Sequence, residues 1–157
     1  MNPMKAKTIH IAIPLLVLLF MGQLSPAAAG TAGIYWQPYD EGMALGKSHQ
    51  KKVFINFYAT WCSYCKMMDT ATFKDAAVIA YLNDNFIAIK VDVDKQRNVA
   101  AHYNISPLPD VWFISEKGEV IGNKPGYIPA EEMLPVLKFI QTDSYLKMSY
   151  QNFLETQ

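Results

Sequence analysis

The stretch VFINFYATWCSYCK, residues 53–66, joins a run of strand-forming apolar residues to the only two cysteines of the chain. Residues 53–58 are almost continuously apolar, a pattern typical of a strand that is buried on both faces. Residues 59–61 predict a turn, and a helix is expected to begin at Cys62 and to run through Met67 and Met68. This order places Cys62 at the first turn of the helix and Cys65 one turn further on.

The spacing of the two cysteines favours chemistry over stability. A bridge between residues three apart closes a very short loop, so it constrains the unfolded chain only slightly. Two thiols this close can instead share a disulfide, transfer it to a substrate and regain it. The alternatives are a pair of small buried apolar residues and a zinc site. Zinc usually needs four ligands, and neither His49 nor His102 lies in a paired motif, so we predict no metal and no cofactor.

The N-terminal residues resemble an export signal. Lys5 and Lys7 precede an apolar run over residues 9–21, and small residues in an A-x-A pattern follow at 25–29. The apolar run is shorter than the roughly 20 residues that cross a bilayer. We therefore predict a signal peptide over residues 1–29, cleavage near Ala29 and a periplasmic or secreted protein. An uncleaved membrane anchor is the alternative.

The charge of the exported chain does not point to nucleic acid or an anionic membrane as a partner. The full chain has 14 basic and 14 acidic residues, and the signal peptide removes two of the lysines and no acidic residue. The remaining net charge, close to −2, gives no reason to expect nucleic acid or an anionic membrane surface as a partner. Residues 30–157 are long enough for one domain with a substantial core.

The rest of the chain predicts alternating helices and strands. Helices are expected at 40–49, 75–83, 97–103 and 129–141, and strands at 86–93, 111–114 and 119–121. Glu116, Lys117 and Gly118 form a hairpin turn signal between the last two strands. This order predicts an α/β fold with a mixed central sheet and helices on both faces. Residues 142–157 predict a helical extension, an amphipathic helix that packs on the core at about 52–140 or docks a partner.

These features make the chain resemble the thioredoxin family. The strand VFINFY, the turn ATW and the helix-opening CSYCK occur in the family's order and spacing, and Pro109 matches the family's cis-proline. Within the family the chain is most similar to the exported branch that includes the C-terminal domain of the membrane electron transporter DsbD. Cys65-Lys66-Met67-Met68, followed by Thr72-Phe73-Lys74-Asp75, carries this similarity.

The resemblance implies a thiol–disulfide oxidoreductase. Cys62, ionised at the helix N-terminus and open to solvent, attacks a substrate disulfide, and the less exposed Cys65 then resolves the mixed disulfide. No charged residue lies between the cysteines to stabilise the thiolate further, which favours a reductant or electron carrier. Its expected partners are disulfide-containing exported proteins and a membrane electron donor of the DsbD type. A disulfide oxidase or isomerase and a non-catalytic binding or chaperone module are the alternatives.

The resemblance also implies which residues meet the substrate, namely Trp61, Tyr64, Leu108, Pro109 and Gly126. Trp61 is expected to shield one side of the site, with an ordinary core aromatic as the alternative. Pro109, rather than Pro107, is expected to be cis, and the Leu108 backbone to pair with an extended substrate segment. Gly126 is expected to let its loop approach the same groove.

One position departs from the family pattern. Asn56 stands where members commonly carry a buried Asp that helps to deprotonate the second cysteine, so Cys65 depends on water, on Lys90 or on the departure of Cys62. Lys90 matches the lysine that partners that Asp and is expected to lack its carboxylate, or to extend along the strand toward solvent. We expect a slower resolving step than in relatives with Asp, and Asn56→Asp should shorten the lifetime of the mixed disulfide.

Overall fold

A computed structural model describes Met1 and residues 33–157. The predicted signal peptide, apart from Met1, therefore lies outside the described residues. In the part that is described, none of the helices has the length and apolar character needed to cross a bilayer.

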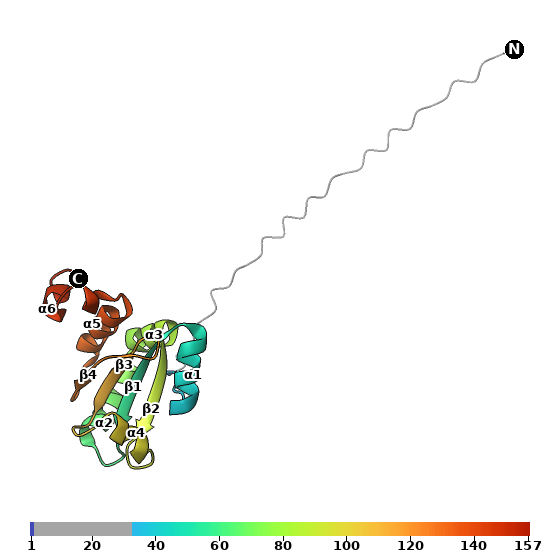
Figure 1. Cartoon of the computed structure of the whole chain (residues 1–157). Helices are drawn as coiled ribbons and strands as arrows, with labels where there is room; N and C mark the ends of the chain where they lie inside the picture. The colour runs from blue at the N-terminus through green and yellow to red at the C-terminus, as the bar shows by residue number, and fades with distance from the viewer. Residues whose placement is uncertain (2–32) are drawn as a thin grey trace.

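The order of elements follows the sequence-based prediction closely (Figure 1). The strands and helices predicted over residues 40–141 are all present, and their bounds differ from the expected ones by a few residues. The strand after the hairpin is longer than expected and includes residues 120–125. The elements are α1 (Tyr39–His49), β1 (Lys52–Tyr58), α2 (Ser63–Thr70), η1 (Thr72–Lys74), α3 (Ala76–Asn85), β2 (Phe86–Asp92), α4 (Arg97–His102), β3 (Asp110–Ile114), β4 (Val120–Pro125), α5 (Ala130–Gln141), η2 (Ser144–Leu146) and α6 (Tyr150–Leu154).

The described strands form one mixed sheet in the order β2-β1-β3-β4. β1 runs parallel to β2 and antiparallel to β3, and β3 is antiparallel to β4. The segment before α1 extends the sheet, because Gln37 forms an isolated parallel bridge with Ile89 on the outer side of β2. The central position of β1 explains why its sequence is apolar on both faces.

Each face of the sheet has its own apolar core. Phe54 of β1 packs with Met68, Leu82 and Leu137, which come from α2, α3 and α5. The other face of the sheet packs against α1 and α4. This second core includes Val53, Ile55, Phe57, Ile89, Val91 and Tyr103. In Figure 1, α2 and α4 lie at the same end of the sheet, and the C-terminal helix α6 lies toward the other end. The expected layers, with helices on both faces, are confirmed.

The C-terminal extension differs from the single amphipathic helix that the sequence predicts. Two short helices, η2 and α6, replace it. Ser149 is the N-cap residue of α6, and its hydroxyl accepts a hydrogen bond from the Asn152 N–H at 3.2 Å, so a new helix begins there. Phe153 is buried, and its ring lies 5.2 Å from that of Phe139 on α5. The extension therefore packs on the domain, as one of the two expectations held, while Leu146 stays exposed.

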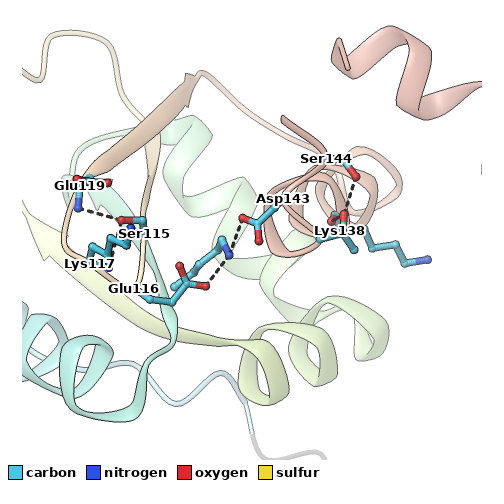
Figure 2. Close-up of polar contacts among 9 residues, drawn as sticks. Ser115, Glu116, Lys117, Glu119, Lys138, Asp143 and Ser144 are labelled. Atoms are coloured by element: carbon cyan, nitrogen blue, oxygen red, sulfur yellow. Dashed lines mark hydrogen bonds and ion pairs between the residues drawn. The ribbon is translucent and has the colours of Figure 1, made fainter. Parts of the chain in front are cut away.

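A lysine at the start of β1 ties the extension to the sheet. Lys52 is only 4% exposed, and its ammonium lies 2.6 Å from Glu116 and 3.0 Å from Asp143. Figure 2 shows Glu116 in the β3–β4 hairpin and Asp143 after α5 reaching toward the same amine. Burial lowers the pKa of Lys52, but the two hydrogen bonds and the two negative charges outweigh it, so the pKa is raised.

Candidate redox site

The two cysteines form a disulfide at the N-terminus of α2. Cys62 is the N-cap residue, its Cα lies 5.3 Å from that of Cys65, and its sulfur accepts a hydrogen bond from the Cys65 backbone N–H at 3.1 Å. The first backbone N–H groups of a helix have no partner within it, and the helix dipole is positive at this end. Negative charge on the Cys62 sulfur is therefore favoured once the disulfide opens.

The disulfide is largely covered in the oxidised chain. Cys62 is 6% exposed and Cys65 is 3% exposed, and with Ala59 they form a buried cluster against which Tyr58 and Leu108 pack. Cys65 is the less exposed of the two, as expected. The expectation of a Cys62 sulfur open to solvent is not met in this disulfide-bonded state, because Cys62 belongs to a buried cluster against which Tyr58 and Leu108 pack.

The loop that faces the disulfide contains the cis bond. The Leu108–Pro109 peptide is cis, which confirms the choice of Pro109 over Pro107. Gly126 donates its backbone N–H to the Pro109 carbonyl at 2.7 Å. The φ angle of Gly126 is +92°, a left-handed conformation that glycine adopts without strain. Gly126 thus lies against the proline loop, and Leu108 packs against the cluster that contains the two cysteines.

Two aromatic side chains form an exposed rim around the disulfide. Trp61 is 66% exposed, and its indole N–H donates to the Asp94 carboxylate at 2.9 Å. The alternative of a core aromatic is therefore wrong for this tryptophan. Tyr64 is also exposed, and its ring centroid lies 6.4 Å from that of Tyr127, which directly follows Gly126.

Asn56 is buried on β1 with an unused acceptor. It is 2% exposed, and its side-chain oxygen Oδ1 has no hydrogen-bond partner among the described residues. Its neighbours in the sheet are Lys90 on β2 and Val111 on β3. An unpartnered buried oxygen is costly, so Asn56 is a local weak point in a largely apolar strand.

Lys90 does have a carboxylate partner, so the expectation that it lacks one is wrong. Its ammonium lies 2.6 Å from Asp69 Oδ1, and Asp69 belongs to α2. The same ammonium lies 4.6 Å from the ring centroid of Tyr58, in a cation–π arrangement. The carboxylate thus comes from the helix that carries the cysteines and not from the neighbouring strand.

Sequence reasoning missed Asp69 and Tyr127. Asp69 follows Cys65 by four residues, so helical periodicity alone places the two on one face of α2. Tyr127 is adjacent to Gly126, which the resemblance had already placed near the groove. Within residues 33–157, no cluster of three or more His, Cys, Asp or Glu side chains is arranged to hold a metal ion.

The site thus combines a cysteine pair at the N-terminus of α2 with a cis-proline just before β3. The family model of a thioredoxin-like domain matches residues 39–141. The chain belongs to this family. The match includes both cysteines, Pro109 and Gly126, which confirms the family and the thioredoxin fold expected from the sequence.

Relatives with thioredoxin-like names support the same assignment. The chain is 33% identical over 91 residues to a thioredoxin of Mycoplasmoides gallisepticum, covering 58% of this chain and 86% of that protein. It is 31% identical over 105 residues to the thiol:disulfide interchange protein DsbD of Vibrio vulnificus, covering 63% of this chain but 17% of DsbD. Thus the chain spans most of the first relative and only a small part of the second.

A solved structure extends the comparison to the fold. The solution structure of a putative disulphide-isomerase from Bacteroides thetaiotaomicron superposes with a TM-score of 0.62 at 26% identity, covering 77% of this chain and 99% of that one. Together with the disulfide-forming cysteine pair, these findings identify the chain as a thioredoxin-like thiol–disulfide oxidoreductase.

Proposed function

We propose that this chain is an exported thiol–disulfide oxidoreductase that reduces substrate disulfides, or relays electrons, through Cys62 and Cys65. The observation that carries the proposal is the position of Cys62 as N-cap of α2, with its sulfur at 3.1 Å from the Cys65 N–H. This geometry stabilises a thiolate at the sulfur that stands first in the chain and nearer to solvent.

The reaction needs two thiol exchanges. In the first, the Cys62 thiolate attacks a substrate disulfide, forms a mixed disulfide and releases one substrate thiolate. In the second, Cys65 loses its proton and its sulfur attacks Cys62 Sγ, which breaks the mixed disulfide and releases the second substrate thiolate. Two electrons pass from the dithiol to the substrate, and the protein is left with the Cys62–Cys65 disulfide.

The loop at Leu108 and the aromatic rim supply the substrate contacts in this proposal. Neither the N–H nor the C=O of Leu108 forms a hydrogen bond among the described residues, so both are free to pair with an extended peptide. Trp61 and Tyr64, each next to a cysteine in the sequence, offer exposed aromatic surface. A Cβ at Gly126 would meet no atom within 4 Å, so the surface beside the proline loop is open at this position.

Electrons are proposed to flow from a membrane donor of the DsbD type to disulfides of exported proteins. The similarity to DsbD supports a donor of this kind. Ser63 and Tyr64, between the cysteines, carry no positive charge that would stabilise the reduced form and make the pair strongly oxidising. The signal-like residues 1–29 support a periplasmic or secreted location.

A disulfide-reduction assay and a redox titration test the proposal. Wild type should reduce a peptide disulfide, Cys62→Ser should be inactive, and Cys65→Ala should accumulate mixed disulfides with its substrates. A rate independent of Cys62 would instead indicate a binding module. The reduction potential should lie well below the value of about −120 mV of the strong oxidant DsbA, and a value near it would favour an oxidase.

The location has its own test. The full chain is expressed in a Gram-negative host, and the periplasmic fraction is analysed by intact mass. We expect a protein that begins at Gly30. Full-length protein in the membrane fraction would indicate the uncleaved anchor.

A further inference from the structure

The carboxylate that directly follows the cis-proline is buried, and the proposed mechanism does not use it. Asp110 is 3% exposed and begins β3. Its hydrogen-bond partners are the side chains of Trp112 and Asn123, which are neutral, and burial raises its pKa. A buried carboxylate with only neutral partners lowers stability, so another requirement must favour it at the end of the proline loop, residues 104–109.

One set of hydrogen bonds joins the end of the proline loop to β4. The Asn123 amide nitrogen lies 3.1 Å from each oxygen of the Asp110 carboxylate. In the sheet, Asp110 pairs with Pro125, the last residue of β4. The next residue, Gly126, donates its N–H to the Pro109 carbonyl at 2.7 Å. Two consecutive residues, Pro109 and Asp110, are thus tied to the same short stretch of chain.

A second contact joins the two ends of the proline loop. The Trp112 indole N–H donates to Asp110 Oδ2 at 2.9 Å, and the Trp112 ring centroid lies 4.9 Å from that of Tyr103. Tyr103 is buried and directly precedes the loop, whereas Asp110 directly follows it. Because the hydrogen bond fixes the direction of the indole N–H, it also holds the indole ring against Tyr103. Asp110 therefore holds the loop at both ends.

Leu108 lies inside the loop that is held in this way. Its side chain packs against the cluster that contains the two cysteines, and its backbone N–H and C=O form no hydrogen bond among the described residues. A free backbone segment can add an extended peptide as a further strand. Binding is tighter when the segment is already ordered, because ordering it during binding costs free energy.

We propose that Asp110 is a positioning residue for peptide substrates, because it holds the proline loop so that the Leu108 backbone is ready to pair with an extended peptide beside Cys62. Asp110 acts through Leu108 and does not touch the substrate. The substrates that benefit are extended chains with a free backbone N–H and C=O next to the disulfide, and small disulfides do not benefit. This inference rests on the proposed function, in which Cys62 attacks the substrate and Leu108 pairs with it.

Two probes with the same leaving group separate binding of the peptide backbone from the chemistry. One is a symmetrical aromatic disulfide, and the other is an extended peptide whose single cysteine is joined to the same aromatic thiol. In both, the Cys62 thiolate attacks one sulfur, the disulfide of the probe breaks, and an aromatic thiolate that absorbs visible light leaves. Stopped-flow mixing with the reduced protein gives the rate of this first phase against probe concentration. A peptide with N-methyl groups beside its cysteine lacks the backbone donors and is the control probe.

We expect Asp110→Leu, which removes both acceptor oxygens, to raise the half-saturating concentration of the peptide about tenfold and to leave its limiting rate unchanged. Tenfold equals about 1.4 kcal/mol, close to the net contribution of one hydrogen bond. The small disulfide and the N-methylated peptide should react as they do with the wild type. Ser115→Ala removes a hydrogen-bonded hydroxyl at the other end of β3 and β4 and should alter the reaction of no probe.

Asn123→Ala keeps the test decisive if Asp110→Leu folds poorly, which circular dichroism detects. Asn123 is exposed, so its truncation should leave the fold intact while it removes the link between Asp110 and β4. The contact with Trp112 remains, so the half-saturating concentration of the peptide should rise by a smaller factor, about threefold. If Asp110→Leu is misfolded, the decision rests on Asn123→Ala alone.

The outcomes separate this inference from the proposed function. If the wild type releases no aromatic thiolate from the small disulfide, or Cys62→Ser releases it equally fast, the proposed function fails. If the wild type does react but the folded variants treat every probe as the wild type does, or slow all of them equally, the inference about Asp110 fails. It fails as well if the wild type has the same half-saturating concentration for the N-methylated and the unmodified peptide.

Discussion

Each end of β1 carries a buried polar side chain, which is paired at one end and lacks a partner for its oxygen at the other. Lys52, at the start of the strand, is 4% exposed and has two carboxylate partners. Asn56, four residues later and on the same face, is 2% exposed and has an oxygen without a partner. One strand thus carries a fully paired charge at the end that holds the C-terminal extension and an unpaired polar group at the end that holds the cysteines.

The difference indicates that architecture and chemistry are separated along the strand. A buried charge with matched partners ties three segments together, and its removal is expected to affect stability alone. A buried polar group without a partner lowers stability and persists only where another requirement outweighs the cost. We therefore expect substitutions at the Lys52 end to change stability and not redox rate. Substitutions at the Asn56 end should change both.

The largest change in the free energy of unfolding is expected from a substitution in the C-terminal extension. Phe153→Ala removes a buried ring that packs on Phe139, and we expect it to lower the free energy of unfolding by about 2–3 kcal/mol. Urea denaturation measures this value, and Leu154→Ala, at a more exposed neighbour, is the control. The rate of disulfide reduction should not change. A parallel loss of rate would show that the two ends are coupled.

The next effect concerns the paired lysine itself. Lys52→Met keeps the length of the side chain and removes its charge-assisted hydrogen bonds, so we expect a loss of about 1–2 kcal/mol in the free energy of unfolding. Because the folded-state pKa of Lys52 is raised above its ordinary 10.5, the difference from wild type should be constant below that pH. It should shrink as the pH rises through the folded-state value. Lys47→Met, at an exposed residue of α1, should show neither effect.

A smaller, pH-dependent change in stability is expected at Asp110, which directly follows Pro109. Burial raises the pKa of Asp110, and hydrogen bonds from Trp112 and Asn123 counteract this only in part. The folded protein therefore binds the proton more tightly than the unfolded chain. Wild type should lose stability relative to Asp110→Asn as the pH rises from 3.8 through the raised pKa. Thermal unfolding at several pH values measures the difference, and an unchanged difference would contradict the prediction.

The smallest expected change is a gain in stability. Asn56→Leu has a similar shape and removes the unpartnered oxygen, so we expect the free energy of unfolding to rise by about 1 kcal/mol or less. Asn98→Leu, at an exposed residue of α4, should bring no gain. Chemical denaturation of the three proteins decides the matter. A loss of stability in Asn56→Leu would mean that Asn56 contributes to packing, and the contrast with Lys52 would no longer hold.

Local sequence patterns predicted the parts of the molecule that depend on local structure. The apolar run before the cysteines required a central strand, and Cys62 had to be close to the start of a helix. The cis bond at Pro109 followed from a family resemblance and not from physical reasoning, because nothing in the residues alone distinguishes it from Pro107.

What the sequence did not reveal depends on how elements pack. The pairing of Lys90 with Asp69 joins β2 to α2, so it depends on the position of the helix on the sheet. The contact of Tyr64 with Tyr127 likewise joins two segments far apart in the chain. In the C-terminal extension, the apolar spacing suggested one helix, but the capping hydroxyl of Ser149 begins a new one.

The bridge between Gln37 and Ile89 has a consequence for solubility. A bare outer strand offers unpaired N–H and C=O groups to any other chain, and it is a common starting point for aggregation. Here the residues just before α1 cover that side of β2, since Gln37 takes a hydrogen bond from Lys90 and gives one to Ala88. At the opposite margin, β4 ends in Lys124 and Pro125 and its pairing with β3 contains an irregularity. A charge, a proline and an irregular register all discourage a second strand from joining, so each margin of the sheet is protected by a different means.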